Sequence, residues 1–197
     1  MHLLFVCTGN ICRSPLAERL TLAYSDAERD ALGGELTASS AGTNAVVGHA
    51  MERSAGLVLR GLGGTPQGFQ ARQLAAEDVD AADLVFTMTR RHRAAVLQLS
   101  PRMMSRTFTL REAASLLTAA NGVDLGYASD LAGRGTLLAE TLAQLRAARI
   151  VDWDRQRDDI KDPIGGDLEH FQRVGDAIAK SLLPLLGALS GDGVRSG

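Results

Sequence analysis

Short apolar runs alternate along the chain with longer segments in which apolar residues recur every three or four positions. The first run, at 2–6, is continuous and ends at a turn signal, which is typical of a strand buried on both faces of a parallel sheet. Soon after the turn, Leu16, Leu20 and Ala23 repeat with helical spacing. The pattern therefore begins with a strand, a loop and a helix.

Three further strands and six further helices are predicted downstream. The strands are expected at 37–41, 83–88 and 106–110, and the helices at 50–60, 75–82, 90–98, 112–120, 137–151 and 168–186. This alternation predicts a doubly wound α/β fold, in which a four-stranded parallel sheet carries helices on both faces. Ligands of such folds bind beyond the carboxyl ends of the strands, where the loop after the first strand lies.

Length and composition suit one folded domain. The chain has 197 residues, of which 45% are hydrophobic and 22% are charged. We expect the domain at 1–187, with an extended helical segment inside it at about 112–159, and a disordered tail at 188–197, which is small and polar. The stretch 121–135 is rich in Gly, Asn and Asp and is expected to be a connector.

Charge and cysteine content narrow the function classes. The formal net charge is -2, so no excess of positive charge points to nucleic acid or to an anionic membrane. The two cysteines are too few for a disulfide framework or for a zinc site built on sulfur. No stretch approaches the roughly 20 apolar residues of a membrane span. We expect a cytoplasmic protein with two free thiols and no membrane or nucleic-acid partner.

The loop after the first strand carries the candidate chemistry. It reads Cys7-Thr8-Gly9-Asn10-Ile11-Cys12-Arg13-Ser14-Pro15. A short loop that leads into a helix N-terminus can direct successive backbone N–H groups at a bound anion. Gly9 permits close approach of the backbone, and Asn10 tolerates a left-handed conformation. Because the planar guanidinium of Arg13 suits two phosphate oxygens, we expect a site for a tetrahedral anion.

Cys7 lies at the base of this loop. The helix N-terminus, the amide dipoles and the guanidinium of Arg13 favour a thiolate over a thiol. A thiolate beneath a bound phosphoryl group is a nucleophile that forms a thiophosphate. Ser14, followed by Pro15, is interpreted as the N-cap of the helix, and its hydroxyl is expected to donate to the sulfur. The alternative is that Cys7 is an inert buried thiol and Arg13 a surface residue.

Asp162 is the candidate proton donor for the leaving oxygen. It opens the segment Asp162-Pro163-Ile164-Gly165-Gly166-Asp167, in which the proline favours an extended conformation that presents the carboxylate. The alternative is an Asp-Pro turn that only precedes the last helix. The acid is favoured because the loop chemistry requires a proton donor.

Four motifs together resemble the low-molecular-weight protein tyrosine phosphatases of bacteria. They are the loop at 7–15, Ser40-Ala41-Gly42-Thr43, Ala71-Arg72-Gln73-Leu74 and Asp162-Pro163. The resemblance implies that Cys7 is the nucleophile, that Arg13 and the loop amides bind the phosphate, and that Asp162 is the general acid and later the base for water. It implies hydrolysis of aryl phosphate monoesters such as protein phosphotyrosine, with no metal or other cofactor.

The resemblance also assigns the remaining loop positions. The phosphate-binding loop it implies consists of Thr8, Gly9, Asn10, Ile11, Cys12, Arg13 and Ser14. Asn10 would hold the loop in shape. Cys12 resembles the family's second loop cysteine, a redox partner that forms a reversible disulfide with the nucleophile; the alternative is a small buried apolar residue behind the loop.

The chain departs from the family pattern at three places. Ile164 and Gly165 follow the Asp-Pro pair, where many members carry aromatic residues that flank the phenol ring. Phe69 stands two residues before the Ala-Arg-Gln segment, where a histidine is frequent. The connection between Leu110 and Asp162 is longer than is usual in the family.

Three other functions use the same loop. Protein arginine phosphatases of this family carry threonine where Ile11 stands, and arsenate reductases pass oxidation to further cysteines that this chain lacks. A catalytically silent phosphate-binding module needs neither Cys7 nor Asp162. Hydrolysis of an aryl phosphate is therefore the favoured hypothesis.

Overall fold

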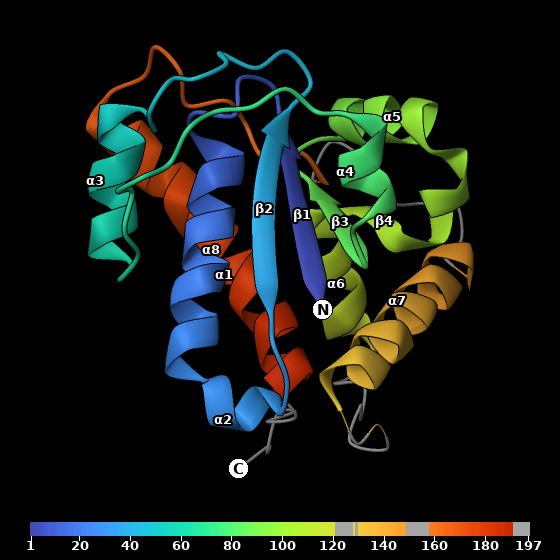
Figure 1. Cartoon of the computed structure of the whole chain (residues 1–197). Coiled ribbons are helices and arrows are strands. Elements are labelled where there is room, and N and C mark those ends of the chain that lie inside the picture. Colours follow the sequence, from blue (N-terminus) through green and yellow to red (C-terminus); the bar gives the residue numbers. More distant parts are fainter. Residues whose placement is uncertain (121–127, 129, 149–157, 191–197) are drawn as a thin grey trace.

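A four-stranded parallel sheet forms the centre of the molecule (Figure 1). The computed structural model describes residues 1–120, 128, 130–148 and 158–190. The strands are β1 (His2–Cys7), β2 (Thr37–Gly42), β3 (Leu84–Thr87) and β4 (Thr107–Thr109), in the order β2-β1-β3-β4, and each neighbouring pair is parallel. The predicted doubly wound α/β fold with four parallel strands is confirmed.

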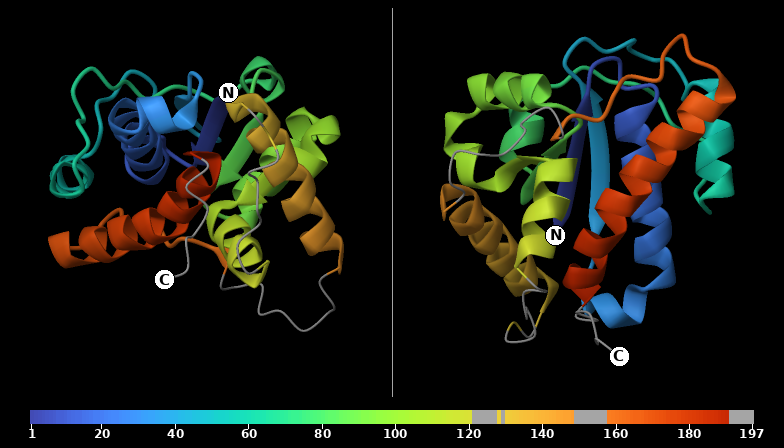
Figure 2. Two further views of the ribbon diagram at one scale, coloured as in Figure 1. Left: turned by 90° about the horizontal axis from the view of Figure 1, so that it is seen from below. Right: turned by 180° about the vertical axis from the view of Figure 1, so that it is seen from behind.

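Both faces of the sheet are covered by helices, which explains the continuous apolar run of β1. Leu3 and Phe5 face a core shared with α1 (Arg13–Ala27), α6 (Leu110–Ala119) and α8 (Leu168–Ser190). Leu4 and Val6 face a smaller core on the other side. That second core is closed by α4 (Ala76–Asp80), α5 (Arg90–Leu99) and the 3-10 helix η1 (Pro101–Arg106). Seen from behind, α8 runs diagonally across the sheet next to α1 (Figure 2).

The remaining helices flank these layers. They are α2 (Arg29–Leu32), α3 (Arg53–Gly61), which packs on α1 and α8, and α7 (Leu131–Ala148), which packs on α6, α8 and η1. The pattern of apolar residues did not predict α2 or η1, which have four and six residues, respectively. Among the described residues, no helix combines the length and apolar character required to cross a membrane.

Several predicted boundaries are wrong. The expectation that Ser14 caps the first helix fails, because α1 already begins at Arg13 and the Ser14 hydroxyl is buried against other partners. Helix α6 begins at Leu110 instead of 112, since Thr109 and Glu112 form a capping box. Part of the expected connector is helical, because α7 begins at Leu131, whose side chain is buried.

The C-terminal boundary also differs from the prediction. Helix α8 continues through Ser190, beyond the expected domain end at 187, because Leu189 is buried in the core. The rest of the predicted tail, at 191–197, lies outside the described residues, as do 121–127, 129 and 149–157 of the predicted helical segment.

Candidate active site

The loop between β1 and α1 is tightly curled. Asn10 has φ 55°, and in the described part of the chain it is the one non-glycine residue with positive φ. The loop packs against the end of β2, where a Cβ at Gly42 would collide with the carbonyl oxygen of Thr8. Gly42 at this strand end lets the loop backbone approach closely, and Asn10 supplies the left-handed conformation that the tight curl of the loop requires.

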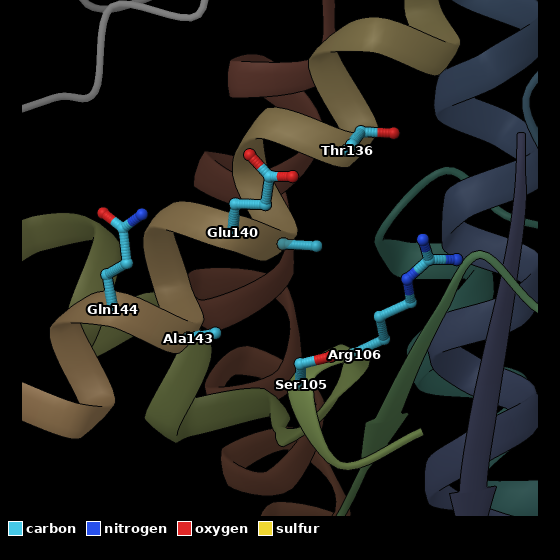
Figure 3. A pocket seen from close by; sticks show the side chains of 7 residues that line it. Ser105, Arg106, Thr136, Glu140, Ala143 and Gln144 are labelled. Carbon is cyan, nitrogen blue, oxygen red and sulfur yellow. The ribbon is translucent and has the colours of Figure 1, made fainter. Parts of the chain in front are cut away.

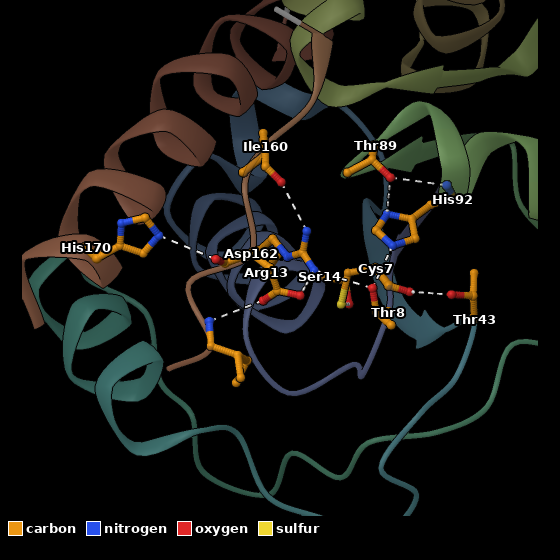
Figure 4. A network of polar contacts seen from close by, with 11 residues as sticks. Cys7, Thr8, Arg13, Ser14, Thr43, Thr89, His92, Ile160, Asp162 and His170 are labelled. Carbon is orange, nitrogen blue, oxygen red and sulfur yellow. Dashed lines mark hydrogen bonds and ion pairs between the residues drawn. The ribbon is translucent and has the colours of Figure 1, made fainter. Parts of the chain in front are cut away.

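Cys7 is buried at the base of the loop, and its Sγ lies 2.9 Å from the Ser14 hydroxyl (Figure 4). The side-chain amide of Asn10 donates to the same Ser14 oxygen at 2.9 Å. Because that oxygen already accepts a hydrogen bond from Asn10, its own proton is available to the sulfur. The geometry thus supplies the sulfur with a hydroxyl donor.

A buried polar network continues from the loop into the fold. Asn10 also donates to the Ser40 hydroxyl at 2.8 Å, and Ser40 donates to the carboxylate of Glu18 at 2.6 Å. The Asn10 side-chain oxygen accepts from the backbone N–H of Arg72 at 2.9 Å. Burial raises the pKa of Glu18. Three of the four motifs named from the sequence therefore meet at Asn10, which holds the loop to β2 and to the segment at 71–74.

Glu18 is a site-supporting residue that the sequence analysis missed. It lies on the inner side of α1, with 9% of its surface exposed, and its position in the helical pattern was the available signal. Phe69, the residue found in place of a frequent histidine, instead packs under the guanidinium of Arg19 at 5.6 Å. The hydrogen-bond network from Asn10 through Ser40 to the Glu18 carboxylate does not include a residue at position 69.

Arg13 supplies the positive charge of the site, and only 4% of its surface is exposed. Its Nη1 donates to the carbonyl oxygen of Ile160 at 3.0 Å, and its Nη2 forms an ion pair with the carboxylate of Asp162 and lies 3.5 Å from the Thr8 hydroxyl. Its buried Nε has no hydrogen-bond partner among the described residues. A buried guanidinium N–H without an acceptor is costly unless an acceptor binds there.

Asp162 comes to this site from the far end of the chain. Its side chain is 46% exposed, so that one carboxylate oxygen meets Arg13 while the group remains accessible to solvent. The backbone N–H of Ile164 donates to the other oxygen at 3.3 Å, and His170 of α8 contacts the Asp162 carbonyl oxygen at 3.4 Å (Figure 4). The loop that carries Asp162 is thus held at both its side chain and its backbone.

The remaining loop positions are placed as follows. Gly9 lies beside Val46, Ile11 is half-buried against the core, and Cys12 is buried behind the loop. Burial raises the pKa of Cys12 to about 12, with smaller contributions from nearby acidic groups including Glu52. The Cys12 thiol is therefore protonated at neutral pH.

A hollow on the surface lies away from this site. It has a volume of about 300 Å³ and lies between η1 and α7 (Figure 3). The residues that line it are Ser105, Arg106, Thr136, Ala139, Glu140, Ala143 and Gln144. It contains no cysteine or histidine, and no group of His, Cys, Asp and Glu in the described ranges has a metal-binding arrangement.

The loop at 7–14 therefore supplies a buried thiol and an unsatisfied guanidinium N–H, and Asp162 brings a carboxyl group to the same guanidinium. Comparison with known proteins identifies the class. The family model for low molecular weight phosphotyrosine protein phosphatases matches residues 2–124, and the chain belongs to this family. Asp162 lies beyond the matched residues, so its position in the site rests on the structure, where it forms an ion pair with Arg13.

Individual relatives agree with the family. The low molecular weight protein-tyrosine-phosphatase Wzb of Salmonella typhi is 36% identical over 104 residues, which are 53% of this chain and 64% of that protein. The chain thus aligns with less than two thirds of this curated relative.

Solved structures match over a longer stretch. A low molecular weight protein tyrosine phosphatase from T. tengcongensis superposes with a TM-score of 0.66 at 27% identity, covering 94% of this chain and 97% of that one. The YwlE arginine phosphatase from Geobacillus stearothermophilus gives 0.60 at 25% identity, covering 92% and 87%.

Proposed function

We propose that this chain hydrolyses aryl phosphate monoesters, with phosphotyrosine in proteins as the substrate class, through a phosphocysteine intermediate on Cys7. The observation that carries the proposal is the meeting of Cys7, Arg13 and Asp162 at one loop, where the buried Nε of Arg13 lacks an acceptor. Family membership supports the same reaction.

Phosphate binding is the first step. The phosphoryl oxygens accept from the Nε and Nη2 groups of Arg13 and from the backbone amides at the N-terminus of α1. The incoming phosphate competes with the Asp162 carboxylate for the guanidinium, since both are anions beside Nη2. Binding therefore releases the Asp162 side chain from its ion pair and leaves it next to the ester.

Transfer to sulfur follows. The Asp162 carboxylate, released from Arg13 and 46% exposed, takes up a proton from solvent. The Cys7 thiolate attacks phosphorus in line with the ester bond, the P–O bond breaks, and the leaving phenolate oxygen takes that proton from Asp162. Water then attacks the phosphocysteine while Asp162 accepts a proton from it, and inorganic phosphate leaves. In this second step the Ser14 hydroxyl, 2.9 Å from Sγ, stabilises the departing thiolate.

The residues around the entrance suit a flat apolar leaving group without a fully aromatic slot. Ile164 is 54% exposed next to Asp162, and Val46 is 38% exposed over Gly9. These exposed aliphatic side chains offer dispersion contacts to a phenol ring. Ile11 offers no hydroxyl to orient water, which is why phosphotyrosine is favoured over phosphoarginine.

The test compares p-nitrophenyl phosphate and phenyl phosphate as substrates of the wild type, Cys7→Ser and Asp162→Ala. We expect Cys7→Ser to lower kcat by about 10³-fold or more. We expect Asp162→Ala to lower kcat by about 10²-fold to 10⁴-fold on phenyl phosphate, and less on p-nitrophenyl phosphate, whose leaving group needs less protonation. Asp176→Ala, which removes an exposed carboxylate of α8, is the matched control.

The outcomes separate the alternatives. Full activity of Cys7→Ser would show that the nucleophile is wrongly assigned. If the wild type does not hydrolyse aryl phosphates but cleaves a phosphoarginine peptide, the substrate class is phosphoarginine instead. Thiol-dependent reduction of arsenate would indicate a reductase. Inactivity on all of them would leave a phosphate-binding module. The cytoplasmic location and the absence of nucleic-acid and membrane partners stay predictions.

A further inference from the structure

His92 contacts the phosphate loop but has no part in the proposed reaction. It lies in the first turn of α5 and is 4% exposed. Its Nδ1 lies 2.9 Å from the Thr89 hydroxyl, and its Nε2 lies 2.9 Å from the hydroxyl of Thr8, the residue that follows the candidate nucleophile (Figure 4). Both ring nitrogens are therefore used, and one of them reaches the loop.

The imidazole is neutral in this position. Burial, and then the positive charge of Arg13, lower the pKa of His92 to about 4, although the nearby Asp162 and Asp159 act in the opposite direction. A neutral imidazole has one N–H donor and one acceptor nitrogen. Which nitrogen donates decides what the Thr8 hydroxyl can do.

The hydrogen bonds around Thr89 are compatible with a ring proton on Nε2. The Thr89 hydroxyl oxygen accepts from the backbone N–H of His92 at 3.2 Å, as the N-cap of α5. Its own proton is free to be donated to Nδ1, 2.9 Å away. In that arrangement the ring proton is on Nε2, and Nε2 donates to the oxygen of Thr8.

The Thr8 oxygen receives a second donor from the other side, because the Nη2 of Arg13 lies 3.5 Å away. A hydroxyl oxygen accepts up to two hydrogen bonds, so when His92 and Arg13 both donate to Thr8 its own hydroxyl proton is left for a third partner. In the proposed mechanism Arg13 Nη2 binds a phosphoryl oxygen. A bound phosphate therefore places an acceptor oxygen near the Thr8 hydroxyl, and this oxygen is the third partner.

We propose that His92 is a positioning residue that donates from Nε2 to Thr8 and so turns the Thr8 hydroxyl into a donor to a bound phosphoryl oxygen. The proposal rests on the proposed function only in its choice of ligand, a phosphate group. It adds a side-chain donor to the loop, and it explains why a buried histidine is held by two threonines beside an arginine.

The first test measures binding of inorganic phosphate by calorimetry, together with kcat and KM on phenyl phosphate. His92→Asn places its amide near the position of Nδ1 and loses Thr8, whereas His92→Gln reaches the position of Nε2. We expect His92→Asn and Thr8→Val each to weaken phosphate binding by about tenfold, the cost of one hydrogen bond to an anion. Glutamine is expected to recover most of that loss, and the double variant His92→Asn/Thr8→Val to bind like Thr8→Val alone.

The opposite results would overturn the assignment. Additive losses in the double variant, or equal losses with asparagine and glutamine, would mean that His92 acts on the fold and not through Thr8. Unchanged binding in His92→Asn would make the contact incidental. Because phosphate binding is read directly, these outcomes stand even if the chain proves inactive on aryl phosphates.

The second test reads the wild-type protein itself. Imidazole ¹⁵N chemical shifts of the wild type report which ring nitrogen carries the proton, with His92→Gln used to assign the signals. We expect His92 to be protonated at Nε2, with and without phosphate. A ring protonated at Nδ1 would require Thr8 to donate to His92, and would rule the proposal out.

Discussion

Two buried arginines, Arg13 in the phosphate loop and Arg134 in α7, have opposite surroundings. Arg13 and Arg134 are 4% and 7% exposed, respectively. The guanidinium of Arg134 donates to the carbonyl oxygens of Leu189 at 2.6 Å, Leu32 at 2.5 Å and Ala128 at 3.4 Å. Its Nε is used in the first of these bonds, whereas the Nε of Arg13 has no partner in the described part of the chain.

This difference indicates that Arg134 is a structural tether, whereas Arg13 belongs to a candidate ligand site. Arg134 joins the C-terminal ends of α2 and α8, where carbonyl oxygens without intrahelical partners carry partial negative charge. Its donors are directed at the protein's own backbone. Arg13 is held by one carbonyl and one solvent-accessible carboxylate, which leaves a donor for an external anion. Burial of a cation therefore does not identify a site; at Arg13 the indication is an unsatisfied donor together with a solvent-accessible carboxylate on the same guanidinium.

Of the two arginines, Arg13 should have the larger effect on activity when it is replaced with lysine. Lysine keeps the charge but lacks the planar set of donors, so phosphate loses its two-point contact. We expect kcat to fall by about 10²-fold to 10³-fold, the usual cost of removing a preorganised donor. Steady-state kinetics on p-nitrophenyl phosphate measure this change. A loss below tenfold would mean that charge alone suffices and that the unpaired Nε has no role.

Replacing Arg134 with methionine should affect stability instead. Two buried carbonyl groups and one partly buried carbonyl group lose their donor, and we expect the free energy of unfolding in urea to fall by about 2–3 kcal/mol. Activity per folded molecule should be unchanged. Arg102→Met is the control, because Arg102 is 68% exposed and its ion pair with Asp80 lies at the surface, where solvent and salt screen it. Equal effects of the two substitutions would refute the tether.

The smallest effect at neutral pH concerns Cys12, which shares the loop with Cys7 but is buried and protonated. The predicted disulfide forms when peroxide oxidises Cys7 to a sulfenic acid and the Cys12 sulfur displaces water from it. Since the pKa of Cys12 is raised to about 12, its thiolate fraction rises about tenfold per pH unit across the alkaline range.

Disulfide yield after peroxide, measured by mass spectrometry, should therefore be low at pH 7 and increase toward pH 9. A yield independent of pH would show that Cys12 does not attack as a buried thiolate. Sulfinic acid on Cys7 at every pH, with no disulfide, would exclude the redox role and leave Cys12 as a packing residue.

The N-terminal half of the site was readable from the sequence because its residues are local. Cys7, Asn10 and Arg13 lie within one loop, and the continuous apolar run before it indicated a buried parallel strand. Ser14 was expected to donate to the sulfur, and its hydroxyl does lie beside Cys7. Its assignment as a helix cap failed, since a serine before a proline has the same pattern whether its hydroxyl caps the helix or serves a neighbour.

Other partners of the site had no sequence signal of their own. Glu18 looked like an ordinary charge in a helical pattern, and His92 like one histidine in a basic stretch. Their roles depend on which side of α1 and α5 faces the loop, and this orientation is set by packing against the sheet. The polar contacts Ser40–Glu18 and Thr8–His92 join segments 22 and 84 residues apart, respectively.

The sequence by itself determined the fold class, the family and the position of the phosphate loop, because strand, turn and helix signals are encoded by neighbouring residues. The tertiary structure decided that Asp162 meets Arg13 across 149 positions, that Arg13 keeps an unsatisfied donor, and that burial raises the pKa of Cys12. Those properties depend on burial and on the distance between remote groups. Hydrogen-bond satisfaction and desolvation exist only once the chain has folded.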